Sequence, residues 1–462
     1  MALIKSISGI RGTIGGQVGE NLTAQDIVEC AAAFGHWVKQ KTNNPRIVIG
    51  RDGRISGEMV NQLVVNALRM VGVSVIDLGL STTPTVEIAV PHEQAGAGII
   101  ITASHNPKQW NALKFINDKG EFISGKDGSE VLQLIDDKAI DYVDVNDLGT
   151  YEYKDGYIQK HIEEIFALEL VNADKIKARN FKVVVDCINS TGAISVIPLL
   201  EQLGCEVIGL NDTINGEFAH NPEPLADNLI ELSKLVVSER ADLGIAIDPD
   251  VDRLAFVCED GEMFGEEYTL VAIADYILTH KKGSTVSNLS STRALRDVTE
   301  KHGCTYHAAA VGEVNVVTQM KAVNAVIGGE GNGGVIYPET HYGRDALAGI
   351  GLFLTHLANF KGPISFLRNS YPDYVISKNK IQLTPDIDVD NLLVQLEKKY
   401  KHLPHTTIDG LKVEFDKDWI HLRKSNTEPI IRIYAESTSE VTANNLANKI
   451  KSDVRGILQE NL

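Results

Sequence analysis

The chain repeats one pattern in residues 46–79, 182–210 and 284–312. In each block an apolar strand leads into a polar turn with Ser or Thr, then a helical stretch, a glycine and a second strand. Ser56 is placed to cap the first of these helices, and Gly72, Gly204 and Gly303 are placed to end the three. Strands that alternate with helices of this length form right-handed crossover units and largely parallel sheets. The pattern therefore predicts three related α/β domains.

The last part of the chain departs from this pattern. From about Tyr371 onward, the stretches "KVEFDKDWIHLRKSNTEPIIRIYAES" and "VTANNLANKIKSDVRGILQ" indicate strands and then a helix, as in an α+β domain. We therefore predict an α/β protein with three similar α/β domains of mixed, mostly parallel sheets and a C-terminal α+β domain. The predicted domains are residues 1–150, 151–255, 256–370 and 371–462.

Composition excludes several classes of partner. Lys and Arg total 44 against 62 Asp and Glu, and the net charge of -18 argues against binding to nucleic acid or to anionic membranes. No stretch approaches the roughly 18 apolar residues of a membrane span, and the start "MALIKSISGIRG" is too short in its apolar run for a secretory signal. The five cysteines are scattered without a CxxC pair, which favours neither disulfides nor zinc. We expect a cytoplasmic protein, and the sequence leaves its oligomeric state open.

The first block is followed by "GIIITASHNPKQWNALKF" at residues 98–115, where an apolar strand runs into a small polar turn. Ser104 lies in this turn beside His105. A serine at a strand end is usually a turn residue, and the alternative is a nucleophile. Lys114 follows on the next stretch and is a candidate for moving protons, provided that it lies close.

The second block leads to "ADLGIAIDPDVDRLAFVCEDG", which places three aspartates between two apolar strands. In extended chain, which has a period of two, the carboxylates of Asp248, Asp250 and Asp252 could all point the same way. Each carboxylate pair at about 4 Å would repel by about 4 kcal/mol at an effective dielectric near 20, and a divalent cation would remove that penalty. Three hard oxygen ligands favour Mg²⁺. A solvated acidic turn and an aspartyl nucleophile are the alternatives.

Two further loops carry groups that suit a sugar phosphate. "AVIGGEGNGGVIYPE" formally contains GxGxxG, but a strand follows instead of the helix that a dinucleotide site needs. Within it, Glu330 and Asn332 could bind sugar hydroxyls, with a glycine-rich hairpin as the alternative. "LRKSNTEPIIRIY" clusters cations with hydroxyl and amide groups, and could hold a phosphate or be a solvated basic turn. Together the four loops point to phosphoryl transfer on a phosphorylated sugar.

The sequence resembles the α-D-phosphohexomutase superfamily, which includes phosphoglucomutase, phosphomannomutase and phosphoglucosamine mutase. The resemblance spans essentially the whole chain. Five motifs occur in the family's order: "SGIRG" at 8–12, "TASHNP" at 102–107, "DPDVDR" at 248–253, "GEGNGG" at 329–334 and "RKSNTEPIIR" at 423–432.

The resemblance implies four domains around a central cleft and a phosphoryl group carried on Ser104. It implies Mg²⁺ bound by that phosphoserine and the three aspartates, Lys114 as general acid/base, and Arg11, Arg253 and His105 in the active site. Glu330 would accept hydrogen bonds from sugar hydroxyls. The phosphate that does not react would be held by Arg423, Ser425, Asn426, Thr427 and Arg432. A hexose 1,6-bisphosphate would be the intermediate, turned over between two transfers that interconvert hexose 1-phosphate and 6-phosphate.

One departure from the family bears on substrate. Many members end the sugar loop with Ser and then His, where this chain has Asn332 and Gly334. We expect a more open pocket and modest discrimination among glucosamine, glucose and mannose phosphates, with glucosamine phosphate favoured. A broadly specific phosphoglucomutase/phosphomannomutase is the alternative. A sugar-phosphate phosphatase and an inactive sugar-phosphate-binding relative are the alternatives of another class.

Overall fold

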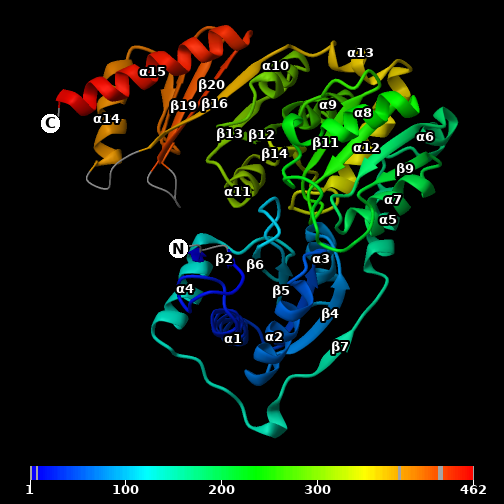
Figure 1. Cartoon of the computed structure of the whole chain (residues 1–462), viewed down its shortest axis with the longest axis vertical. Helices are drawn as coiled ribbons and strands as arrows, with labels where there is room; N and C mark the ends of the chain where they lie inside the picture. The colour runs from blue at the N-terminus through cyan, green and yellow to red at the C-terminus, as the bar shows by residue number, and fades with distance from the viewer. Residues whose placement is uncertain (1–2, 7–8, 383–386, 425–429, 461–462) are drawn as a thin grey trace. The chain divides into compact units, whose positions relative to one another are not determined.

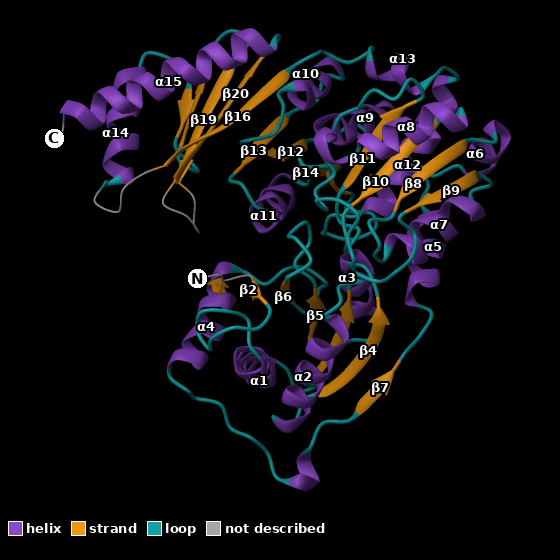
Figure 2. Ribbon diagram, viewed as in Figure 1, coloured by secondary structure: helices purple, strands orange, loops and turns teal. Residues whose placement is uncertain are grey.

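The computed structural model describes residues 3–6, 9–382, 387–424 and 430–460. The chain forms two compact units, and neither is continuous in sequence. The larger unit comprises residues 1–277 and 332–368, and the smaller unit comprises residues 278–331 and 369–462. Figures 1 and 2 show the elements of both units.

The larger unit begins with a seven-stranded mixed sheet in the order β1-β2-β6-β5-β3-β4-β7. Parallel pairing joins β3 to β4 and β5, and β4 to β7, whereas β1, β2, β6 and β5 pair antiparallel in turn. The strands are β1 (Leu3–Ser6), β2 (Gly9–Thr13), β3 (Arg46–Arg51), β4 (Ser74–Leu80), β5 (Ala97–Ile101), β6 (Trp110–Ile116) and β7 (Tyr151–Tyr153). The helices are α1 (Ala24–Lys41), α2 (Gly57–Met70), α3 (Thr83–His92) and α4 (Gly125–Asp136).

The central strands of this sheet are apolar on both faces because helices cover both. Along β3, Ile47 and Ile49 belong to the cluster that contains residues of α1 and α2, and Val48 between them belongs to the cluster that contains residues of α3. Successive side chains of a strand alternate between faces, so a continuous apolar run is what a sheet covered on both sides requires. Figure 2 shows helices on either side of these strands. The polar turns at the strand ends are thereby fixed to a rigid layer.

A second sheet in the larger unit has the order β11-β10-β8-β9, with β8, β9 and β10 parallel and β11 antiparallel to β10. Its strands are β8 (Lys182–Asp186), β9 (Glu206–Leu210), β10 (Leu243–Ile247) and β11 (Leu254–Cys258). The accompanying helices are α5 (Tyr157–Ala167), α6 (Ala173–Arg179), α7 (Gly192–Gln202), α8 (Ile230–Glu239) and α9 (Glu266–His280). Strand β15 (Gly334–Ile336) and helices α12 (Ala346–Phe360) and α13 (Ile364–Arg368) complete the unit, and α12 packs against α5, α6 and β11.

The smaller unit contains two sets of strands. In the first, β12 (Thr285–Asn288) pairs in parallel with β13 (Tyr306–Ala309) and β14 (Ile327–Glu330), accompanied by α10 (Ala294–Lys301) and α11 (Glu313–Val323). The second is an antiparallel sheet in the order β16-β20-β19-β18-β17. Its elements are β16 (Val375–Gln382), α14 (Val389–Tyr400), β17 (His405–Thr406), β18 (Leu411–Glu414), β19 (Trp419–Lys424), β20 (Ile430–Ser437) and α15 (Glu440–Glu460).

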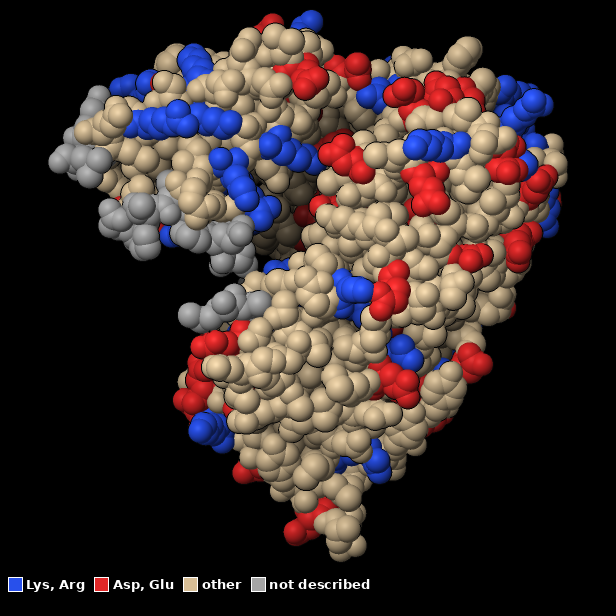
Figure 3. All heavy atoms as spheres, viewed as in Figure 1, with Lys and Arg blue, Asp and Glu red and all other residues tan. Residues whose placement is uncertain are grey.

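The predicted fold class is confirmed: three mixed, mostly parallel α/β sheets are followed by a C-terminal antiparallel sheet with helices. Gly72, Gly204 and Gly303 each follow a block helix with φ between +68° and +79°, a conformation that favours glycine. The predicted cap at Ser56 is wrong, because its hydroxyl makes no capping bond and accepts instead from Asn111 Nδ2 at 2.9 Å. On the face drawn in Figure 3, basic and acidic side chains are interspersed. Among the described residues, no helix combines the length and apolar character that crossing a membrane requires.

Candidate active site

The turn after β5 presents Ser104 to the second sheet of the larger unit. Ser104 is 6% exposed, and its Oγ donates to Asp248 Oδ2 at 2.6 Å, although the two residues lie 144 positions apart. Its φ of +49° is in the left-handed region, which costs about 1–3 kcal/mol for a residue other than glycine and is held by surrounding structure. His105 Nδ1 lies 3.4 Å from the same Oγ.

Arg54, which the sequence reasoning missed, holds the Ser104 turn in place. Its buried guanidinium donates to four backbone carbonyls of the turn, those of Ser104, Asn106, Pro107 and Trp110, at 2.5 to 2.9 Å. Asp52 pairs with Arg54 Nε at 3.0 Å and accepts from the Thr102 hydroxyl at 2.6 Å. The Asp52–Arg54 ion pair therefore holds the turn that contains the strained Ser104. A signal was present in "GRDGRISG", where a polar run follows a buried strand.

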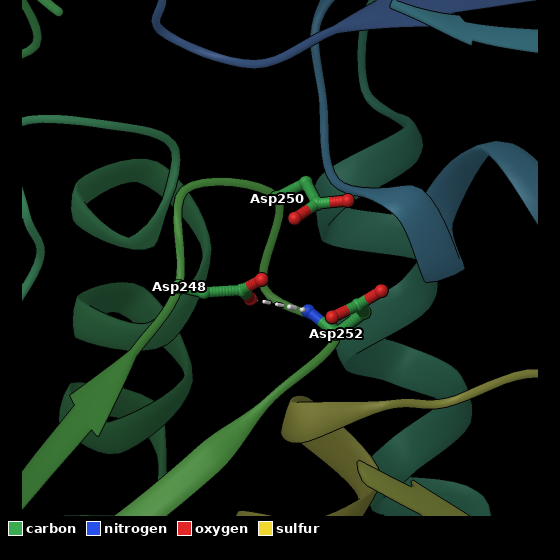
Figure 4. Close-up of side chains that lie close together, drawn as sticks. All are labelled: Asp248, Asp250 and Asp252. Atoms are coloured by element: carbon green, nitrogen blue, oxygen red, sulfur yellow. Dashed lines mark hydrogen bonds between the residues drawn. The ribbon is translucent and has the colours of Figure 1, made fainter. Parts of the chain in front are cut away.

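The three aspartates form one buried cluster between β10 and β11 (Figure 4). One ligand oxygen from each of Asp248, Asp250 and Asp252 lies within 4.8 Å of the others, and all three residues are fully buried. The expected extended geometry is wrong, because the segment turns and Val251 has φ +61°. The turn lets the amides of Asp252 and Arg253 each donate to Asp248 Oδ1 at 3.1 Å. The carboxylates converge because the loop folds back, and strand alternation plays no part.

Neighbouring groups balance part of the charge on this cluster. Lys114 Nζ lies 3.0 Å from Asp250 Oδ2 and 4.0 Å from Asp252 Oδ2. Thr83, at the start of α3, donates its hydroxyl to Asp250 Oδ2 at 2.6 Å. Burial alone would raise the pKa of Asp250, but the Lys114 ammonium and the hydrogen bonds to Asp250 together outweigh it and lower that pKa. Burial and the two neighbouring carboxylates instead raise the pKa of Asp248 well above its usual range.

The cluster fits a divalent cation. Asp250 Oδ1 and Asp252 Oδ1 are buried and have no hydrogen-bond partner. A buried carboxylate oxygen without a partner is costly, and an ion supplies what is missing. The donor set consists of oxygen alone, which suits Mg²⁺ better than zinc or copper. Ser104 Oγ, hydrogen-bonded to Asp248, is directly beside this candidate metal site.

Arg11 and Arg253 lie near the Ser104 turn and the aspartate loop, respectively. Arg11 Nη1 donates to Asn106 Oδ1 at 3.4 Å, and burial lowers the Arg11 pKa. Arg253 Nη1 pairs with Glu223 Oε1 at 3.2 Å, while its Nε is buried without a hydrogen-bond partner. Both guanidiniums thus retain donors that an anionic group could use.

The space beside Gly334 is filled, so the expectation of a more open pocket there is wrong. A Cβ added at Gly334 would lie 2.3 Å from Arg344 Cδ. Arg344 Nη2 donates to Asp252 Oδ2 at 2.6 Å, which pins the side chain in that position. Asn332 Oδ1 accepts from the Gly334 amide at 3.2 Å. The absent side chain at 334 is thus replaced by a buried arginine that contacts the aspartate cluster.

The described residues that are predicted to bind the sugar or the phosphate lie in the smaller unit, except Asn332, which lies in the larger one. Glu330 is 5% exposed, and its Oε1 accepts from Asn288 Nδ2 at 2.8 Å and from the Gly312 amide at 3.1 Å. On the C-terminal sheet, Arg423 of β19 is directly opposite Arg432 of β20. Ser425, Asn426 and Thr427 lie outside the described residues.

Comparison with known proteins assigns the chain to a family. Models for "Phosphoglucomutase/phosphomannomutase" match in chain order, with alpha/beta/alpha domain I at residues 3–140, domain II at 155–261, domain III at 265–374 and the C-terminal domain at 386–452. The chain belongs to the phosphoglucomutase/phosphomannomutase family of the α-D-phosphohexomutase superfamily. It is therefore a phosphohexomutase, as predicted, and a phosphorylated sugar is the implied substrate.

Individual relatives of this phosphohexomutase carry different names. It is 32% identical to a "Phosphoglucosamine/phosphogalactosamine mutase" of Sulfurisphaera tokodaii over 99% of this chain and all of that one. It is 33% identical to a "Phosphoglucomutase/phosphomannomutase" of Thermococcus kodakarensis over 94% of this chain and 95% of that one. A crystal structure of a phosphoglucomutase/phosphomannomutase family protein from Burkholderia thailandensis matches with a TM-score of 0.86, at 27% identity, over 98% of this chain and 97% of that one.

The phosphohexomutase also has a third cation beside the two predicted arginines of its C-terminal sheet. Lys380 of β16 is directly opposite Arg432, which is directly opposite Arg423, so the three form one row on one face. Like charges directly opposite each other destabilise a sheet. Among the described residues, no acidic side chain pairs with Lys380 or Arg432. The row favours a bound anion, and no sequence signal identified Lys380, because strand register was unknown.

The phosphohexomutase has a buried charge network centred on Asp345, the residue that follows Arg344. Asp345 caps α12 and accepts from His161 Nε2 at 3.0 Å and from His341 Nε2 at 3.4 Å. His341 Nδ1 also lies 3.3 Å from Glu87 of α3. Burial alone would lower the pKa of His341, but the carboxylates of Asp345 and Glu87 outweigh it and raise that pKa to about 10. The network ties α3, α5 and α12 together next to the aspartate cluster.

Proposed function

We propose that this phosphohexomutase interconverts hexose 1-phosphate and hexose 6-phosphate through a phosphoryl group carried on Ser104. The observation that carries the proposal is the 2.6 Å hydrogen bond between Ser104 Oγ and Asp248, which puts a strained serine against a buried oxygen cluster. Phosphoryl transfer needs positioning and charge stabilisation more than covalent chemistry. A turn fixed by Arg54 and a preformed oxygen site provide the first of these.

The proposed reaction consists of two opposite transfers. The phosphorus–oxygen bond to Ser104 breaks as a sugar hydroxyl oxygen bonds to phosphorus, and the proton of that hydroxyl ends on the freed Ser104 oxygen. The resulting hexose 1,6-bisphosphate turns over, and its other phosphate returns to Ser104 as the Ser104 hydroxyl gives up its proton to the freed sugar oxygen. Lys114 is the proposed group that moves the proton, and Arg11, Arg253 and His105 would bind the transferring group.

Mg²⁺ is the proposed metal of the aspartate cluster, where it would polarise the phosphoryl oxygens and offset the carboxylate charge. Asp248, Asp250 and Asp252 would hold it together with the phosphate on Ser104. Glu330 and Asn332 would bind sugar hydroxyls. The row of Arg423, Arg432 and Lys380, with Ser425, Asn426 and Thr427, would bind the phosphate that is not reacting.

Glucosamine phosphate is the proposed preferred substrate, supported by the name of the Sulfurisphaera relative. Glucose and mannose phosphates are the alternative, supported by the name of the Thermococcus relative. The domain boundaries at 150, 255 and 370 and a cytoplasmic location remain predictions.

The test measures products and the site of phosphorylation together. Purified protein is supplied with glucosamine, glucose or mannose 1-phosphate, and both 6-phosphate and free phosphate are followed. We expect 6-phosphate from all three, fastest from glucosamine 1-phosphate, and phosphate mapped to Ser104. Ser104→Ala should abolish turnover, whereas the exposed Ser129→Ala should not. Release of free phosphate alone, or stable phosphate only on Asp248 or Asp250, would overturn the proposal.

A further inference from the structure

A short path of two hydrogen bonds and one ion pair joins Glu330 to Arg423 within the smaller unit. The Gly312 amide donates to Glu330 Oε1 at 3.1 Å, and the preceding amide, of Val311, donates to Asp409 Oδ2 at 3.0 Å. That same Asp409 oxygen lies 2.8 Å from Arg423 Nε. The path from Glu330, proposed to bind the sugar, to Arg423, proposed to bind the phosphate, therefore consists of two successive backbone amides and the Asp409 carboxylate. Gly312 has φ +113°, which only glycine adopts readily, so the turn that spaces these amides is specific.

A second path joins the same two regions through side chains. Asn288 donates to Glu330 Oε1 at 2.8 Å and accepts from the Ser290 amide at 2.9 Å. The Ser290 hydroxyl lies 2.9 Å from His421 Nδ1, and His421 Nε2 lies 2.6 Å from the backbone oxygen of Asp409.

The tautomer of His421 follows from these partners. A carbonyl oxygen only accepts, so Nε2 carries the hydrogen, and Nδ1 then accepts from Ser290. Burial lowers the His421 pKa to about 4, which keeps the imidazole neutral, as these hydrogen bonds require. The two paths close into a ring in which Asp409 is held by both its side chain and its backbone.

The Asp409 carboxylate balances the positive charge of Arg423. Arg423 is directly opposite Arg432, which is directly opposite Lys380. Without a neighbouring anion, Arg423 would be pushed away from this row. Asp409 is the carboxylate that pairs with Arg423, and its position is fixed relative to Glu330 by the ring.

We propose that Asp409 is a positioning residue that holds the phosphate-binding Arg423 at a fixed span from the sugar-binding Glu330. This inference rests on the proposed function, because it assigns a purpose to two of its binding residues. Both ends of one sugar phosphate would then meet groups that are already placed before binding, which lowers the ordering cost of association. Asp409 itself touches no substrate.

The test measures binding without turnover, in the Ser104→Ala background, using glucose 1-phosphate and calorimetry. Asp409→Asn should raise the Kd about tenfold, which is about 1.4 kcal/mol. In an Arg423→Gln background the same substitution should change the Kd less than twofold, because its effect passes through Arg423. Asp416→Asn removes an exposed carboxylate of the same sheet domain and is the matched control, expected to change the Kd less than twofold.

Two further measurements test the positioning role of Asp409. Ser290→Ala removes the hydroxyl partner of His421 without touching Asp409 and should raise the Kd about threefold, which corresponds to about 0.6 kcal/mol. With Ser104 restored, Asp409→Asn should raise KM for the sugar phosphate and leave phosphorylation of Ser104 intact. An unchanged Kd in Asp409→Asn, or an equal effect in the Arg423→Gln background, would overturn the positioning role. Failure of the proposed function would show separately, as absent 6-phosphate from the unmodified protein.

Discussion

Replacing Arg344 with glutamine tests whether this arginine balances the charge of the aspartate cluster. Arg344 Nη2 lies 2.6 Å from Asp252 Oδ2, and both residues are buried. Breaking a buried ion pair by removing one partner costs about 3–5 kcal/mol. Lys114 Nζ and Arg253 Nε each remain 4.0 Å from an Asp252 oxygen, so part of the charge stays balanced. We therefore expect the lower end, about 3 kcal/mol, in metal-free protein.

A divalent cation should reduce this difference. The substituted cluster carries more uncompensated negative charge, so it should bind Mg²⁺ more tightly than the original cluster does. A ligand at a hundred times its Kd stabilises the folded state by about 2.7 kcal/mol. Because the original protein gains such stabilisation as well, the difference in excess Mg²⁺ shrinks by RT ln of the ratio of the two Kd values, about 1.4 kcal/mol if Arg344→Gln binds the ion tenfold more tightly.

The assay is urea unfolding followed by far-ultraviolet circular dichroism, once with a chelator and once with Mg²⁺. Lys234→Gln is the matched control, since it removes an exposed cation from α8 and should change stability by less than about 0.5 kcal/mol in either condition. Equal stability of Arg344→Gln and the original protein in chelator would show that Arg344 does not balance the charge of the aspartate cluster. A difference that widens on adding Mg²⁺ would show the same.

Three other substitutions give direct readouts. Lys380→Met should weaken glucose 1-phosphate binding about fivefold and raise stability by up to about 1 kcal/mol, because a like-charged neighbour of Arg432 is removed; calorimetry and thermal unfolding check both, and unchanged affinity would exclude Lys380 from the anion site. Glu330→Ala should lower kcat/KM at least a hundredfold on glucosamine, glucose and mannose 1-phosphates alike, and a loss confined to one sugar would contradict a shared hydroxyl contact. The folded pKa of His341, about 10, lies above its unfolded value of 6.5, so its stabilisation is complete below pH 6.5 and is lost as pH rises toward 10. The stability advantage over His341→Gln should fall by about 1.4 kcal/mol per pH unit between pH 7 and 9 in urea titrations, and a constant difference would count against the network.

Local sequence was enough to predict the fold class and to single out the loops that contain the candidate site residues. The repeated strand, helix and glycine pattern has one meaning wherever it occurs, so the α/β blocks and the left-handed Gly72, Gly204 and Gly303 followed from it. Ser104 and the aspartates were recognisable because each lies between apolar strands within a short segment. The roles assigned to these residues remain predictions.

The partners of these residues could not be predicted, because they come from distant segments. Thr83 meets Asp250 across 167 positions, and Arg344 meets Asp252 across 92. Extended geometry was the wrong assumption for the aspartates, since Val251 turns the chain. The position of Lys380 depends on the register of β16 against β20, which no spacing within the sequence encodes. The absence of a side chain at Gly334 suggested empty space, but the Arg344 side chain fills that space.

The discontinuity of the larger unit imposes an order on how the protein is made. When residues 1–277 have left the ribosome, Ser104 and all three aspartates exist, but Arg344 and Asp345 do not. The intervening segment of 278–331 belongs to the other unit and has to be synthesised before residues 332–368 can return. A simple truncation after residue 277 therefore yields a nascent site with unbalanced charge and an uncovered apolar surface where α12 packs. Such a fragment should depend on chaperones, whereas a version that rejoins 332–368 through a short linker should fold alone.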